Sequence, residues 1–313
     1  MDPITLYGGA FSLYTGRARS YLIKSKIDYR EEPHSSAYFY DVVLPKAGGR
    51  RGIPTIEFPN GDVIRDGVAI IDHYESTNGG KFSPETPKQR ILSLLFDVIG
   101  AEGMLRPCMH YRFNQGEEEG EFLSFHFSTV YPEKNGAKDR IAFIKSTVLP
   151  AWGVAPNTKD LIETMHFKTL KKLNAHFSIY PYLFGNKPSI GDFGMIAPLY
   201  GHLGRDPVPL SLMQINAPRL FRWVERMNRS EPDIGEFADK STNYLANEFD
   251  GTRFVYENST YGVFIKDETV TGQTSGATAN VTAVAVSNVA NFSDLEAAIE
   301  TAILGNLAAS TTS

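Results

Sequence analysis

GIPTIEFPNGDVIRDGVAIIDHYE, residues 52–75, is the stretch of this sequence that decides the fold. Two short apolar runs, residues 55–58 and 63–65, predict strands, and the Asn60-Gly61 pair between them is a strong local hairpin signal. The apolar residues that follow recur at three- and four-residue spacing, which indicates a helix, and Asp66 stands where a side chain would cap its free amides. The stretch therefore predicts a hairpin followed directly by a capped helix.

The chain has 313 residues, of which 42% are hydrophobic and 21% are charged, a composition typical of soluble globular proteins. This length suits two domains of ordinary size. Lys and Arg total 31 against 36 Asp and Glu, a net charge of −5. Such a balance offers no basic surface for nucleic acid or an anionic membrane, so neither is expected as a partner.

Cys108 is the single cysteine in the sequence, which excludes an internal disulfide and a cysteine-rich metal site. The first residues contain no basic segment followed by an apolar core, and no run of 18 apolar residues occurs. The seven histidines show no close metal-ligand spacing, and no metal site is predicted. We expect a cytoplasmic protein on these grounds.

Upstream of the deciding stretch, alternating β-branched residues predict a strand over residues 4–7 and another over residues 27–31. Between them, residues 13–26 have helical periodicity, with Ser12 at the cap position. The order is thus βαβ, an irregular segment, and then ββα. Residues 78–87 are rich in Gly, Pro and Ser, which is typical of a linker between domains.

The second half of the chain shows helical periodicity without strand patterns and predicts an all-α domain. Expected helices cover residues 89–111, 138–147, 160–177, 192–202 and 217–227. Ser189 and Asp192 have the three-residue spacing of a capping box at the start of a helix. From about residue 251 the sequence becomes rich in Thr, Ser, Gly and Val, with β-like runs and one last helix at 293–299, and we predict no function for this tail.

The Ile53-Pro54 pair at the start of the hairpin, and the segment FGNKPSIGD at residues 184–192, resemble conserved features of glutathione transferases. The resemblance covers about residues 4–230 and is closest to a bacterial subgroup of the serine or cysteine type. It implies an α/β thioredoxin-like N-terminal domain (1–77), a linker (78–87), an all-α C-terminal domain (88–250) and an extra tail (251–313).

In this family a hydroxyl or thiol at the start of the first helix stabilises the thiolate of bound glutathione, the nucleophile of the reaction. The resemblance implies Ser12 as this donor, while the alternative is that Ser12 is only a helix cap. Tyr7, at the end of the first strand, occupies the position used by tyrosine-type members and is the second candidate. Tyr14 and Thr15 are further alternatives.

The resemblance also implies residues for binding glutathione. The proline of Ile53-Pro54 would be cis, so that the Ile53 main chain pairs with the cysteinyl backbone of glutathione. The family pair of Glu or Gln followed by Ser is replaced here by Asp66-Gly67, which loses a hydroxyl. One lost hydrogen bond to a charged group costs roughly 1.5–3 kcal/mol, so a weaker affinity is expected. Arg51 is a candidate for the glycyl carboxylate.

The electrophile pocket in the family is lined by the first helix of the second domain. Soft and aromatic side chains suit such a pocket, although an ordinary core role is an open alternative for each of them. The candidates are Met104, Met109, His110, Tyr111 and Phe113.

Two hypotheses follow for function. The first is a homodimeric, cytoplasmic glutathione transferase-like detoxification enzyme that activates the glutathione thiol for attack on a small hydrophobic electrophile. Glutathione-dependent reduction or isomerisation would need the same parts. The second is a glutathione transferase fold that serves as a non-catalytic binding or assembly module, which the loss of the hydroxyl at Gly67 favours.

Overall fold

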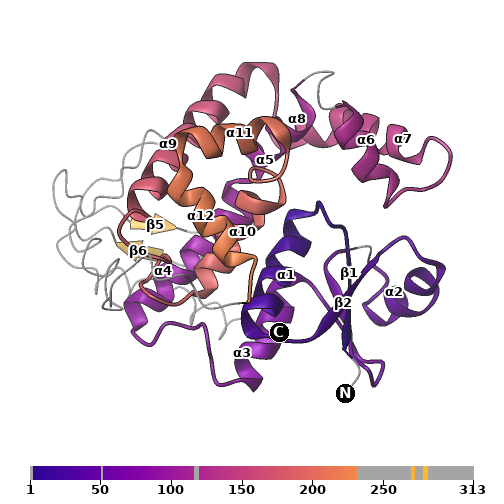
Figure 1. The fold of residues 1–313 in the computed structure, drawn as a ribbon, viewed down its shortest axis with the longest axis horizontal. Coiled ribbons are helices and arrows are strands. Elements are labelled where there is room, and N and C mark those ends of the chain that lie inside the picture. Colours follow the sequence, from indigo (N-terminus) through magenta and orange to yellow (C-terminus); the bar gives the residue numbers. More distant parts are fainter. Residues whose placement is uncertain (1–2, 51, 116–119, 231–268, 272–277, 281–313) are drawn as a thin grey trace.

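A computed structural model describes residues 3–50, 52–115, 120–230, 269–271 and 278–280 (Figure 1). Its N-terminal part is a four-stranded mixed sheet with two longer helices and one short helical segment. The elements are β1 (Ile4–Gly8), α1 (Leu13–Ser25), β2 (Tyr29–Pro33), β3 (Thr55–Glu57), β4 (Val63–Arg65) and α3 (Gly67–Thr77). The sheet order is β2-β1-β3-β4, with β1 parallel to β2 and antiparallel to β3. The predicted thioredoxin-like arrangement is confirmed.

Local chemistry accounts for these elements. Gly61 adopts a left-handed φ of 86°, which glycine reaches without steric cost, and its N–H donates to the Phe58 carbonyl at 2.8 Å. Asp66 Oδ1 accepts from Val68 N at 2.8 Å and so caps α3. The segment expected to be irregular contains a π-helical turn, η1 (Phe39–Val43), that runs into α2 (Leu44–Lys46).

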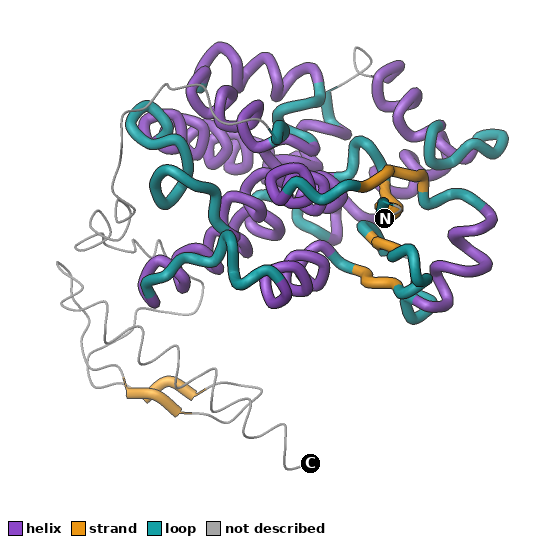
Figure 2. Tube along the Cα trace, turned by 60° about the horizontal axis from the view of Figure 1, so that its bottom comes forward, coloured by secondary structure: helices purple, strands orange, loops and turns teal. Residues whose placement is uncertain are grey.

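Every element described between Pro87 and Met227 is a helix, as predicted for the second domain. Figure 2 shows these helices packed beside the strands of the N-terminal part. The helices, in order, are α4 (Pro87–Val98), η2 (Ile99–Gly103), α5 (Leu105–Phe113), α6 (Gly120–Ser128), α7 (Gly136–Phe143), η4 (Ile144–Val148), α8 (Leu149–Ala151), η5 (Pro156–Thr158), α9 (Lys159–His176), α10 (Ile190–Gly201), α11 (Pro207–Asn216) and α12 (Pro218–Met227).

The single helix expected over residues 89–111 is wrong, because the π-helical segment η2 interrupts it before Met104. The interruption coincides with a close packing contact: a Cβ on Gly100 would overlap the backbone of Gly194 in α10. Sequence reasoning also missed α6 and α11.

Helix α10 joins the two parts of the molecule. Ten of its twelve residues are buried, and it packs against both α1 and α4. Glycines allow backbone contact on both sides, because a Cβ on Gly194 would overlap Asp97 Cα and a Cβ on Gly201 would overlap Leu13 Cα. A buried ion pair between Arg17 of α1 and Asp97 of α4, with Nη2 and Oδ1 2.6 Å apart, connects the same two helices.

The start of α10 is fixed by the predicted capping pair. The Asp192 carboxylate accepts from Ser189 N at 2.9 Å and from Ser189 Oγ at 2.8 Å. It also accepts from Leu183 N at 3.1 Å and from Trp223 Nε1 at 3.0 Å. Burial raises the pKa of this carboxyl to about 6. One side chain thus ties the loop before α10 to the helix itself and to α12.

Beyond residue 230 the structure describes only an antiparallel pair, β5 (Thr269–Thr271) and β6 (Thr278–Asn280). The helix expected at residues 293–299 lies outside the described residues. Helix α3 ends at Thr77 and α4 begins at Pro87, so the predicted linker at residues 78–87 lies between these two helices. The division of the chain into domains stays a prediction. Within the described part of the chain, no helix has the length and apolar character needed to cross a bilayer.

Candidate functional site

Strand pairing brings together the two segments singled out in the sequence. Strands β1 and β3 are antiparallel with Tyr7 opposite Thr55, so the loop after β1 and the turn before β3 lie at the same end of the sheet. A cavity of about 170 Å³ lies beside that turn. Its lining residues are Arg50, Gly52, Ile53, Arg65 and Asp66.

The Ile53-Pro54 peptide bond is cis. The Pro54 carbonyl accepts from Asp66 N at 2.9 Å, and Thr55 Oγ1 donates to the Gly52 carbonyl at 3.1 Å. No described residue forms a hydrogen bond with the main-chain N–H or C=O of Ile53. The carbonyls of Gly52 and Pro54 are thus engaged within the protein, while the N–H and C=O of Ile53 remain a donor and an acceptor for a ligand backbone.

Asp66 and Gly67 differ in what they offer to a ligand. Asp66 is exposed at the cavity, and its φ of 87° is unusual for a residue with a side chain; such conformations often occur at functional sites. Gly67 is buried, and a Cβ there would lie 3.3 Å from Arg17 Cδ and 3.7 Å from Pro54 Cγ. A serine at position 67 would therefore need Arg17 to shift.

Two cations lie on the cavity, and neither was predicted. Arg65 Nη1 donates to the Arg50 carbonyl at 3.1 Å, which holds the two residues side by side. Arg51, the predicted arginine, lies outside the described residues. Arg65 could have been found from the sequence, because it is the last strand residue before the capping Asp66 and therefore lies at the predicted binding edge.

Ser12 is the N-cap of α1. Its Oγ accepts from Thr15 N at 3.3 Å, and its own N–H donates to the Gly9 carbonyl at 3.0 Å. The side chain is half-buried, and none of the described residues accepts the proton of its hydroxyl. The hydroxyl therefore keeps a donor for an anion at the start of α1, where the helix dipole also favours negative charge.

The other candidate hydroxyls have partners. The Tyr7 hydroxyl donates to Glu57 Oε2 at 3.0 Å, and burial together with this hydrogen bond raises the pKa of Tyr7. The Tyr14 hydroxyl donates to Glu102 Oε1 at 3.3 Å. Thr15 is fully buried, and its Oγ1 accepts from Gly9 N at 3.3 Å.

The predicted electrophile-pocket residues lie in the interior. Met104 and Tyr111 belong to the main core, whereas Met109 and Phe113 belong to a second apolar cluster around α6. His110 is buried, and its Nε2 lies 2.9 Å from Glu163 Oε1. Of the five, only Phe113 lines one of the described cavities, a space of about 90 Å³.

Val130 and His126, rather than the predicted pocket residues, adjoin the loop that carries Ser12. Val130 lies 3.7 Å from the point where a Cβ on Gly9 would stand. The ring of His126, on α6, lies 5.6 Å from that of Phe11. Burial and the charges of Arg205 and Arg112 lower the pKa of His126. These contacts depend on α6, which sequence reasoning did not predict.

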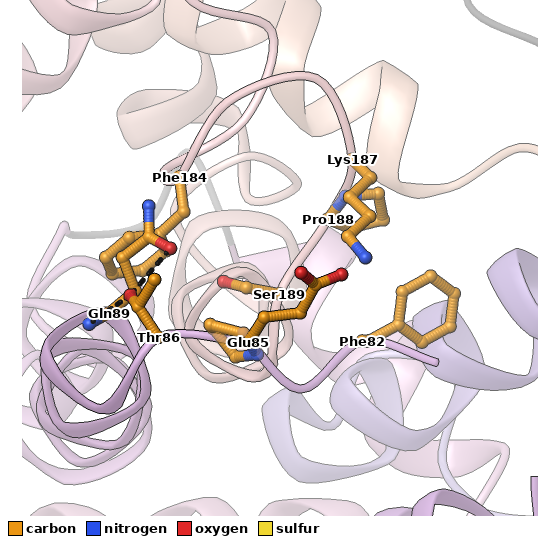
Figure 3. A pocket seen from close by; sticks show the side chains of 9 residues that line it. Phe82, Glu85, Thr86, Gln89, Phe184, Lys187, Pro188 and Ser189 are labelled. Atoms are coloured by element: carbon orange, nitrogen blue, oxygen red, sulfur yellow. Dashed lines mark hydrogen bonds between the residues drawn. The ribbon is translucent and has the colours of Figure 1, made fainter. Parts of the chain in front are cut away.

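Another cavity, of about 80 Å³, lies between the linker and the loop before α10 (Figure 3). Phe82 and Phe184 contribute apolar walls, with Glu85 and Lys187 among the polar lining residues. It contains none of the predicted catalytic residues. Among the described residues, no group of three or more His, Cys, Asp or Glu side chains is arranged to hold a metal ion.

Comparison with known families agrees with this geometry. Residues 6–82 match the family described as Glutathione S-transferase, N-terminal domain. Residues 157–231 match the family described as Glutathione S-transferase, C-terminal domain. Together the matches support membership of the glutathione S-transferase family, whereas no curated protein sequence matches the chain.

A solved structure with a TM-score above 0.5 supports the fold, and a second one is similar at a lower score. A GST-like protein from Pseudomonas syringae is 17% identical, with 88% of this chain and 81% of that one covered and a TM-score of 0.51. A Tau class glutathione S-transferase from mango, Mangifera indica, is 16% identical, with 79% of this chain and 96% of that one covered and a TM-score of 0.46.

Proposed function

We propose that this chain is a glutathione transferase-like enzyme. Glutathione binds beside Ile53-Pro54, and Ser12 stabilises its thiolate for attack on a small apolar electrophile, a detoxifying conjugation. A thiolate is the reactive form, so lowering the thiol pKa raises the reactive fraction at neutral pH. Reduction or isomerisation by glutathione would use the same groups. Two family matches, one to each half of the transferase fold, support this proposal.

The charges around the 170 Å³ cavity suit glutathione, a tripeptide with two carboxylates and one ammonium group. Arg50 and Arg65 supply two cations, and the exposed Asp66 supplies one anion. The unpaired main-chain groups of Ile53 suit the central peptide of the ligand. Guanidinium groups bind carboxylates in a bidentate manner, so the two arginines are the proposed carboxylate ligands.

The observation that carries the catalytic proposal is the free hydroxyl proton of Ser12. Its lone pair is engaged by Thr15 N, which orients the hydroxyl, while no described residue accepts its proton. The hydroxyls of Tyr7 and Tyr14 are already committed to carboxylates. Ser12 is therefore the proposed thiolate donor.

The alternative is a glutathione transferase fold that serves as a non-catalytic binding or assembly module. One observation favours it: Arg17 packs where a serine at position 67 would stand, and its guanidinium is held by Asp97. The site then lacks a hydroxyl that would otherwise bind glutathione.

Homodimer formation is proposed on the exposed apolar residues of α4 and η2. The exposed fractions of Leu94, Leu95, Val98 and Ile99 are 54%, 36%, 59% and 48%. Contiguous apolar surface of this kind is typical of protein interfaces.

Glutathione-affinity retention followed by a conjugation assay tests the proposal. The wild type should be retained and active, and Ser12→Ala should lower turnover roughly ten- to hundredfold, the value of one hydrogen bond to a charged group. Ser178→Ala is the matched control, because Ser178 is exposed and its hydroxyl only donates to Ala175 O in its own segment. It should leave turnover unchanged.

Each contrary result has a distinct meaning. Absence of retention refutes glutathione binding at this site. Retention with no conjugation by the wild type favours the non-catalytic module. Full activity of Ser12→Ala refutes the Ser12 assignment, and Tyr7→Phe then becomes the next variant.

A further inference from the structure

Each of the four carbonyls from Gly8, at the end of β1, to Phe11, just before Ser12, is held by a donor. The Gly8 carbonyl accepts from His34 N at 3.3 Å, and the Gly9 carbonyl accepts from Ser12 N at 3.0 Å. The Ala10 carbonyl accepts from Arg205 Nη1. The Phe11 carbonyl accepts from Arg112 Nη1 at 2.8 Å. Two of the four donors are thus guanidinium groups from the helical part of the chain.

Arg112 is a rigid anchor for this loop. Its Nε and Nη2 bind the two oxygens of Asp206 at 2.6 and 2.7 Å, and Nη2 also donates to the Gly201 carbonyl at 2.8 Å. The side chains of Arg112 and Asp206 are 3% and 2% exposed. A buried bidentate pair fixes the guanidinium plane, so the position of the Phe11 carbonyl is fixed with it.

Helix α10 supports the same loop from its C-terminal end. A Cβ on Gly201 would overlap Leu13 Cα, so the backbone of α10 touches the first residue of α1. The Gly201 carbonyl is itself one of the groups that Arg112 binds. The loop and the first turn of α1 are therefore held by the helical part of the chain on both sides of Ser12.

Arg205 differs from Arg112 in its charge balance. It contacts the Ala10 carbonyl, and its guanidinium carbon lies 5.6 Å from the centre of the Tyr200 ring. Within the described chain no carboxylate forms an ion pair with Arg205, whereas Arg112 is neutralised by Asp206. Asp206 also attracts Arg205, but its carboxylate is paired with Arg112, so the two arginines and this one carboxylate leave one net positive charge beside the start of α1.

The remaining ionisable groups near the loop do not cancel this charge. His34, whose Nδ1 lies 3.1 Å from the Gly8 carbonyl oxygen, and His126, whose ring adjoins that of Phe11, lie at the loop. Arg17 and Arg19, on α1 itself, are paired with Asp97 and Glu31. The lowered pKa of His126, to which the charges of Arg205 and Arg112 contribute after burial, is consistent with a positive potential at the loop.

We propose that Arg205 and Arg112 are positioning residues for thiol activation: Arg112 fixes the loop that presents Ser12, and Arg205 adds an uncompensated positive charge beside it. Neither residue needs to touch the substrate. This inference rests on the proposed function, because the anion it serves is the glutathione thiolate.

Two measurements on the full chain test the inference. The first follows the ultraviolet absorbance of the thiolate of bound glutathione against pH in the wild type, Ser12→Ala, Arg205→Gln, Arg205→Lys and Arg112→Lys. Removing the charge of Arg205 should raise the pKa of the bound thiol by about half a unit to one unit in Arg205→Gln. Arg205→Lys keeps the positive charge, so the pKa of the bound thiol in this variant should stay close to the wild-type value.

Arg112→Lys keeps the charge but cannot reproduce the bidentate geometry. We expect turnover to fall at least tenfold with a small change in the affinity for glutathione, because the loop is no longer held in place. Arg222→Gln is the control. Arg222 pairs with Glu225 on the surface of α12, away from this loop, and its substitution should change neither quantity.

The second measurement uses the protein without glutathione. The pKa of His126, followed by its NMR chemical shift, should rise in Arg205→Gln and remain near the wild-type value in Arg222→Gln. This readout reports the charge at the loop directly and does not depend on substrate.

The outcomes separate the inference from the proposed function. Suppose that Ser12→Ala raises the pKa of the bound thiol, but that Arg205→Gln changes neither the pKa of the bound thiol nor the pKa of His126. The inference is then refuted and the proposed function stands. If Ser12→Ala leaves the thiol pKa unchanged, the Ser12 assignment fails. If the wild type shows no bound thiolate at all, both fail together.

Discussion

Removing the carboxylate of Asp192 should destabilise the protein strongly. In Asp192→Ala the buried donors Ser189 N, Leu183 N and Trp223 Nε1, each now bound at 2.9–3.1 Å, lose their acceptor. An unsatisfied buried donor costs about 1–3 kcal/mol. The three costs do not simply add, because the three donors share one carboxylate. Burial of that carboxylate, which raises its pKa to about 6, also offsets part of the stability that its hydrogen bonds contribute. We therefore expect a loss of about 3–5 kcal/mol.

Urea unfolding followed by circular dichroism measures this loss directly, and thermal unfolding gives an independent value. For a folded region of this size, 1 kcal/mol corresponds to about 2–4 °C, so the midpoint should fall by roughly 6–20 °C. Asp72→Ala is the matched control, because Asp72 is exposed on α3, and it should change stability by less than about 0.5 kcal/mol. A loss below about 1 kcal/mol in Asp192→Ala would refute this account of how α10 is anchored.

Three further predictions concern association, pH and the contact between α1 and α4. Leu94→Glu with Val98→Glu should convert a dimer into monomers in sedimentation experiments; a dimeric double variant would place the interface elsewhere. Burial lowers the pKa of His166 to about 4, so the folded state binds fewer protons than the unfolded one, and stability is lost as pH falls from about 6.5 towards 4. In urea unfolding, the free energy of unfolding of His166→Phe should fall by about 3 kcal/mol less than that of the wild type between pH 6.5 and pH 4. Equal losses in the two proteins would contradict the lowered pKa of His166. Arg17→Ala should cost about 3–5 kcal/mol in the same assay, because it leaves the buried Asp97 carboxylate unpaired, and a cost below 1 kcal/mol would show that the pair contributes little.

The elements predicted well from the sequence are those with local signals. The Asn60-Gly61 turn, the Asp66 cap and the Ser12 cap depend on residues within four positions, and the strands and helices around them lie within two residues of their predicted bounds. The α11 start also had a local signal, Asp206 followed by Pro207 at the first helical position, which sequence reasoning did not use.

Failures came where distant contacts decide the structure. The break at η2 depends on Gly100 meeting Gly194, residues that no local pattern connects. Periodicity identified an apolar side of α4, but it could not show that Leu94 and Val98 on that side are exposed in the single chain. An apolar stripe indicates only that a surface avoids water, and the same stripe suits a core or an interface.

The candidate site divides in the same way. The cis Ile53-Pro54 bond and the caps at Ser12 and Asp66 were predicted, because they depend on nearby residues, whereas the roles of these residues toward glutathione stay predictions. The five pocket candidates lie in the interior, and their role in a pocket stays a prediction, because whether an apolar side chain lines a cavity or fills a core depends on the neighbouring helices. The positions of Arg205 and His126 beside the loop of Ser12 depend on contacts across more than one hundred residues.

The glycine contacts of α10 have a consequence for how such a protein can change during evolution. Backbone meets backbone at Gly194 and Gly201, so no layer of adaptable side chains separates α10 from α4 and α1. Sliding or tilting these helices would therefore break the contact. We expect variation in the proposed substrate choice to fall on side chains around the candidate site and on segments outside this frame, such as α6.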